Sequence, residues 1–99
     1  MTAVHLSPEA LADLDAIWDY IAKDSPANAD GFIERLVQAV TSTLATAPRA
    51  GRVRDEFDDT LRSFPFERYL VIYRVQKDAV QIVRIIHGAR DLTDRKSVV

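Results

Sequence analysis

Residues 68–87 read RYLVIYRVQKDAVQIVRIIH, and this stretch decides the fold. Val, Ile and Tyr dominate both halves of it, and β-branched and aromatic residues of this kind are enriched in strands. Three polar residues, 76–78, form the only short break between the halves, and their number suits a hairpin. The stretch therefore predicts two antiparallel strands, Arg68 to Val75 and Ala79 to His87, joined by a tight turn.

The faces of this hairpin follow from its turn. With the turn centred on Lys77 and Asp78, residues equally distant from it pair, and alternate residues point to opposite faces. One predicted face holds Tyr69, Val71, Tyr73, Val80, Ile82, Arg84 and Ile86, and the other holds Arg68, Leu70, Ile72, Arg74, Gln81, Val83, Ile85 and His87. Because both faces are largely apolar, we expect helices to cover one and a binding partner to cover the other.

Two helices are predicted upstream of the hairpin. Ser7 and Pro8 are typical of a helix start, and Leu11, Leu14, Trp18 and Ile21 then recur at helical spacing. Asp24 or Ser25 is expected to cap a second helix that runs to about Ala47. Its apolar stripe is Phe32, Ile33, Leu36, Val37, Val40 and Leu44. Only about four residues connect the two helices, and so short a connection forces them into an antiparallel hairpin. Trp18, Tyr69 and Tyr73 are expected in the core.

The remaining segments complete an α+β plan. Ala3 to Leu6 is a candidate edge strand, and residues 49–60 are so densely charged that we expect a loop. Leu61 to Phe64 begins the sheet, and Pro65 indicates a strand end or an edge. The predicted fold is a short N-terminal strand, an antiparallel helical hairpin and a C-terminal antiparallel β-sheet.

Composition bounds the rest. The chain has 99 residues and no cysteine, which predicts one domain, 1–99, and excludes disulfides and thiolate chemistry. No apolar run could span a membrane and no secretory signal is recognisable, so we expect a cytoplasmic protein without a membrane partner. Residues 1–48 carry two basic and seven acidic residues, whereas residues 49–99 carry eleven basic and eight acidic ones. An acidic partner could meet this arginine-rich half.

Few enzyme classes fit these residues. His5 and His87 are the only imidazoles and no ligand spacing surrounds them, so no metal or other cofactor is expected. A nucleophile elbow and a phosphate-binding glycine loop are absent from the sequence. Acid–base cleavage of RNA stays open, with His87 moving the proton and Arg62, Arg74 and Arg90 holding phosphate. The alternative is that His87 is a structural residue at a strand end.

Several pieces in this order resemble a known family. They are LDAIWDYIA at 14–22, PRAGR at 48–52, LR at 61–62, YLVIYRV at 69–75 and RIIHGARD at 84–91. The chain resembles the ParE toxins of the wider ParE/RelE superfamily over residues 3–92. The resemblance implies a toxin of a type II toxin–antitoxin system, with a role in plasmid stabilisation. It also implies inhibition of DNA gyrase and neutralisation by a ParD-like antitoxin.

The resemblance also suggests where contacts lie. Six basic residues are expected to touch the target or the antitoxin: Arg52, Arg54, Arg62, Arg74, His87 and Arg90. Direct binding of nucleic acid by the toxin alone is not expected at a net charge of −2. We expect a binding inhibitor rather than a catalyst. The alternatives are a RelE-like ribosome-dependent mRNA endoribonuclease that uses His87, Arg62 and Arg74, and a non-toxic degenerate toxin that acts as a co-repressor with its antitoxin.

Overall fold

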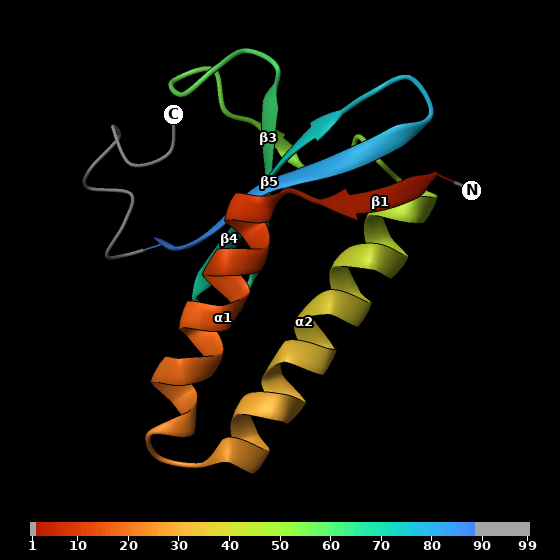
Figure 1. Ribbon diagram of the computed structural model, residues 1–99. Coiled ribbons are helices and arrows are strands. Elements are labelled where there is room, and N and C mark those ends of the chain that lie inside the picture. Colours follow the sequence, from red (N-terminus) through yellow and green to blue (C-terminus); the bar gives the residue numbers. More distant parts are fainter. Residues whose placement is uncertain (1, 89–99) are drawn as a thin grey trace.

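The computed structural model describes residues 2–88 and confirms the α+β plan. A short strand β1 (Ala3–Leu6) precedes the helices α1 (Pro8–Ala22) and α2 (Pro26–Thr46). The strands β2 (Arg52–Val53), β3 (Leu61–Phe66), β4 (Tyr69–Val75) and β5 (Ala79–His87) follow. They form one sheet in the order β1-β5-β4-β3-β2, in which β1 runs parallel to β5 and the other pairs are antiparallel. Both helices lie side by side against one face of the sheet (Figure 1).

Both helices begin as their sequences predict. The hydroxyl of Ser7 accepts a hydrogen bond from the N–H of Ala10, and that of Ser25 accepts one from Asn28, with proline next in each case. The Ser7 hydroxyl also donates to the carbonyl oxygen of Val83, at 2.8 Å. This bond fixes the start of α1 to β5.

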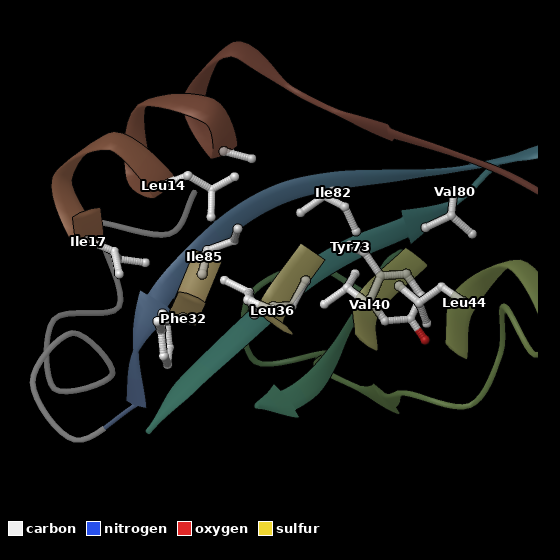
Figure 2. Close-up of a cluster of buried hydrophobic side chains, with 12 residues drawn as sticks. Leu14, Ile17, Phe32, Leu36, Val40, Leu44, Tyr73, Val80, Ile82 and Ile85 are labelled. Atoms are coloured by element: carbon white, nitrogen blue, oxygen red, sulfur yellow. The ribbon is translucent and has the colours of Figure 1, made fainter. Parts of the chain in front are cut away.

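The main core lies between the helices and the sheet (Figure 2). Tyr73 is fully buried there, as predicted, among Val40, Leu44 and Val80. The prediction for α1 was wrong in part. Ala10, Leu14 and Ile17 face the sheet, while Leu11 is 52% exposed and Trp18 is only partly buried. The small side chain of Ala10 lets α1 approach β5 closely. With Ala10 facing the sheet, the larger residues Leu11 and Trp18 point outward.

The predicted hairpin register is wrong beyond Tyr73, because the structure has a β-bulge there. Val75 pairs with Val80 and Tyr73 with Ile82, as the turn predicts, but Ile72 pairs with Arg84. The extra residue in β5 reverses the faces beyond that point. As a result Ile85 packs in the main core under the helices, and Ile86 lies in a cluster on the second face, the opposite of the prediction.

The predicted loop at 49–60 contains β2, which was missed, and it partly covers the second face of the sheet. Arg52 pairs with Ser63, so β2 extends the sheet by two residues. Phe57 then packs against Leu61, Ile72 and Ile86, which are nearly inaccessible to solvent. The chain itself therefore supplies much of the cover that the sequence assigned to a partner.

Candidate functional site

Three of the predicted contact residues share the second face of the sheet. Residues directly opposite each other on paired strands point to the same side. Arg52 lies opposite Ser63 and Ile72 in one row across the strands, and Arg74 lies opposite Leu61 in the next. Arg54 joins the second row because its N–H donates to the carbonyl oxygen of Leu61. We call Arg52, Arg54 and Arg74 the arginine surface.

Two of these guanidinium groups are held by neighbouring side chains. Nε of Arg54 donates to the hydroxyl oxygen of Ser63 at 2.7 Å, and one terminal nitrogen lies 3.2 Å from the carboxylate of Glu56. Nε of Arg74 donates to the Thr60 hydroxyl at 3.0 Å, and its terminal nitrogen lies 3.7 Å from Asp58. Arg52 is exposed. The surface thus presents two guanidiniums held by neighbouring side chains and a third, that of Arg52, which is exposed near Glu56.

Two carboxylates are stabilised as anions beside this surface. The N–H of Thr60, and then its hydroxyl, lower the pKa of Asp58. A hydrogen bond from its own backbone N–H chiefly lowers the pKa of Glu56, and Arg54 lowers it further. Both groups are therefore ionised at neutral pH, and their charges lie beside the arginines. A hollow of about 360 Å³ lies between Arg52, Arg54 and Pro65.

Arg62 is placed differently from the arginine surface. It lies opposite Tyr73, which belongs to the helix side of the sheet. One terminal nitrogen donates to the carbonyl oxygen of Gly51 at 2.9 Å and to that of Arg49 at 3.3 Å. Its charge is therefore directed at the backbone between α2 and β2.

His87 lies at the other end of the helix-side face. It pairs with Tyr69, and the two rings meet edge to face with centroids 5.4 Å apart. Tyr69 is four residues from Tyr73 along β4, which corresponds to roughly 13 Å of strand. His87 therefore lines a separate hollow with Asp19 and Tyr20 of α1. Arg90 lies outside the described residues 2–88.

The structure thus does not bring the three residues of the RNase alternative together. His87 and Arg62 share a face but lie far apart along it, and Arg74 lies on the opposite face. Proton transfer requires heavy atoms at about 2.6–3.2 Å, or one water between them. In the described residues, therefore, His87 and these two arginines do not surround one phosphate site, whereas Arg52, Arg54 and Arg74 share one face beside the carboxylates of Glu56 and Asp58.

A second candidate surface lies on the helical hairpin and was missed from the sequence. A shallow, open groove of about 1120 Å³ runs along α2, and Trp18 of α1 lies on one side of it. We call it the hairpin groove; its lining is Trp18, Asp30, Ile33, Glu34, Val37, Gln38, Thr41 and Ser42. The indole N–H of Trp18 donates to Asp30 at 2.8 Å, which fixes the ring across the two helices. The sequence signal that could have indicated this groove is Trp18, whose position in α1 is compatible with either the buried or the exposed face of the helix.

Asp13 is a further residue that the sequence did not single out. Its carboxylate accepts two hydrogen bonds from the Arg84 guanidinium, at 2.8 and 3.0 Å, and one from the N–H of Ile85 at 2.8 Å. These bonds join α1 to β5 beside the bulge. They hold the hairpin in place on the sheet.

The sequence was compared with known protein families and with individual proteins. Residues 4–92 match the family described as the ParE toxin of type II toxin-antitoxin system, parDE. The chain is 44% identical over 82 residues to Toxin RelE2 of Caulobacter vibrioides, which covers 82% of this chain and 89% of that protein. It is 30% identical over 89 residues to Toxin ParE1 of Mycobacterium tuberculosis, covering 88% of this chain and 90% of the relative.

A solved structure has the same fold. It is described as the chromosomal ParDE TA system from P. aeruginosa, and one of its chains superposes with a TM-score of 0.75 at 28% identity. The match covers 88% of this chain and 96% of that one. The strand, helical hairpin and sheet therefore recur together in that structure.

Proposed function

Because the chain belongs to the ParE toxin family of type II toxin–antitoxin systems, we propose that it inhibits DNA gyrase and is neutralised by a ParD-like antitoxin. The arginine surface supports a binding inhibitor. Arg54 and Arg74 are held in fixed positions by their neighbours, as a recognition surface requires, and the described residues place no imidazole beside them. Gyrase would locate this activity in the cytoplasm.

The hairpin groove supports the second half of the proposal. Its walls are apolar at Trp18, Ile33 and Val37, and its rim is acidic at Asp30 and Glu34. An amphipathic helix with basic residues beside its apolar stripe would complement this groove. We assign the groove to a helix of the antitoxin and the arginine surface to acidic residues of the gyrase target.

The test is a supercoiling assay with the purified chain and bacterial gyrase. The unmodified chain should inhibit supercoiling, and a triple variant with Arg52, Arg54 and Arg74 changed to Ala should inhibit it at least about tenfold less. His87→Ala should inhibit like the unmodified chain. Unchanged supercoiling in excess of the chain would contradict the proposal.

The RNase reading stays the second candidate, because one relative at 44% identity carries the name RelE2. It predicts that His87→Ala lowers the rate of mRNA cleavage on translating ribosomes by about 100-fold or more. Growth inhibition that survives His87→Ala would count against it. A chain that is harmless without its antitoxin would instead support the co-repressor alternative.

A further inference from the structure

Both backbone polar groups of Gly51 form hydrogen bonds to side chains of the sheet. Its N–H donates to the hydroxyl oxygen of Tyr73 at 2.7 Å, and its carbonyl oxygen accepts from Arg62 at 2.9 Å. Tyr73 is fully buried in the main core, where its ring lies near Val40 and Leu44 (Figure 2). Its hydroxyl bonds the segment that follows α2. The two bonds therefore connect a buried tyrosine of β4 and an arginine of β3 to a single glycine.

Gly51 immediately precedes the arginine surface. Arg52 is the next residue, and β2 has only two residues with which to pair on β3. So short a strand has little stability of its own. The segment 49–54 therefore depends on contacts other than its ladder to keep Arg52 and Arg54 in position.

The charge of Arg62 is used within the molecule. Its terminal nitrogen bonds the carbonyl oxygens of both Arg49 and Gly51, which lie on the same segment. A guanidinium bound in this way holds a loop by its backbone, because backbone carbonyls are neutral acceptors in fixed directions. Such a residue affects a partner through the loop that it orders.

We propose that Tyr73 and Arg62 are positioning residues, which hold Gly51 so that Arg52 and Arg54 face the target. Neither residue itself contacts the target. The proposal rests on the proposed function, since it takes the arginine surface as the contact region. It adds Tyr73, a core residue, to the determinants of toxicity and changes the role that the sequence assigned to Arg62.

The first test is amide hydrogen exchange in Tyr73→Phe, which removes only the hydroxyl. Loss of the bond should make the Gly51 N–H exchange about tenfold faster, while the amide of Leu36 in the core changes much less. Tyr20→Phe removes a hydroxyl from an exposed ring and should leave the Gly51 rate unchanged. Equal acceleration at Gly51 and Leu36 would show a purely structural role, and an unchanged Gly51 rate would overturn the proposal.

The second test is growth inhibition, read as the inducer dose that halves colony number. Tyr73→Phe and Arg62→Leu should each raise this dose, but neither should raise it further when Arg52 and Arg54 are already Ala. Additive losses would overturn the proposal, because each residue would then act independently of the two arginines. If Tyr73→Phe fails to fold, Arg62→Leu gives the same comparison, because it removes the bond to the carbonyl oxygen of Gly51.

The two hypotheses fail in different ways. If the unmodified chain does not inhibit growth or gyrase, the proposed function is wrong. The exchange rates would still decide whether Tyr73 and Arg62 hold the segment.

Discussion

Of the three glycines, Gly51 is the one at which an added Cβ atom fits worst. A Cβ atom there would lie 2.4 Å from the Tyr73 hydroxyl and 2.7 Å from the carbonyl oxygen of Ser63. The first neighbour is a core side chain and the second is backbone, so neither can move cheaply. We expect Gly51→Ala to lower the free energy of unfolding by about 1–3 kcal/mol in urea denaturation.

Gly31 supplies the matched control for that measurement. It lies inside α2, and a Cβ atom there would meet only the end of Arg35 at 3.4 Å. Gly31→Ala should raise the free energy of unfolding by about 0.5–1 kcal/mol, because alanine is the better helix former. Equal effects of the two substitutions would contradict the close packing at Gly51.

Asp13 is expected to matter more than any other acidic residue of α1. Its side chain is 16% exposed and accepts three hydrogen bonds from Arg84 and Ile85. Asp13→Ala should cost about 2–3 kcal/mol of unfolding free energy, because the Arg84 guanidinium and the N–H of Ile85 would both lose this carboxylate as an acceptor. Asp15→Ala, on the exposed side of the same helix, should change it by less than about 0.5 kcal/mol.

Tyr73 gives stability a dependence on alkaline pH. Burial raises its pKa above the ordinary value of 10.0, against smaller opposite effects of Gly51 and Arg62. Above pH 10 the unfolded chain loses this proton first, so the free energy of unfolding falls as pH rises toward the folded pKa. Tyr73→Phe should lack this part of the decline in denaturation curves recorded from pH 8 upward. An identical decline in both proteins would assign it to other groups.

Residue roles were predicted where one local rule decides them. Ser7 caps α1 as predicted, because a hydroxyl before a proline-led helix start has one favourable use. For α2 the sequence offered Asp24 or Ser25, and the cap is Ser25. The role of Arg62 could not be predicted, because it depends on carbonyl groups eleven and thirteen positions away in the chain. Sequence spacing contains no information about contacts of that kind.

At the scale of elements, both helices and all strands of four residues or more were predicted with small errors at their ends. The hydrophobic period identifies each of them, because each buries one face. The two-residue strand β2 is too short to show a period. The bulge in β5 was missed for a related reason: both Ile85 and Ile86 are apolar, so the sequence fits either face equally well.

The hairpin groove allows a test at this scale. Val37 is 37% exposed on its wall, so Val37→Glu should leave the fold intact while placing a charge opposite the apolar stripe of a docked helix. We expect the affinity for the antitoxin of the same operon to fall at least about tenfold in calorimetry. Gyrase inhibition by the free chain should persist.

Asn28→Glu is the matched control on the same helix. It adds the same charge at an exposed position outside the groove lining, three residues after the cap Ser25, where glutamate favours the helix start. Antitoxin affinity should not change in this variant. A similar loss in both variants would mean that net charge, rather than the groove, controls binding.

At the scale of the whole molecule, charge and fold divide in the same place. The acidic first half forms the helical hairpin, and the basic second half forms most of the sheet. Neither helix has the combination of length and apolar character needed to cross a membrane, within the described residues. The sequence predicted this division and the fold. It named the three arginines of the arginine surface only within a set of six expected contact residues, and it did not point to the hairpin groove, which depends on which face α1 turns to the sheet.

Inhibition of DNA gyrase by binding is the proposal on which the roles of both surfaces depend. The most direct measurement is pulse labelling of DNA and protein synthesis in cells, minutes after the chain is induced without its antitoxin. Thymidine incorporation should fall first, and the triple Ala variant at Arg52, Arg54 and Arg74 should abolish this fall. Amino-acid incorporation that falls first, and is restored by His87→Ala, would contradict the account and establish the RNase instead.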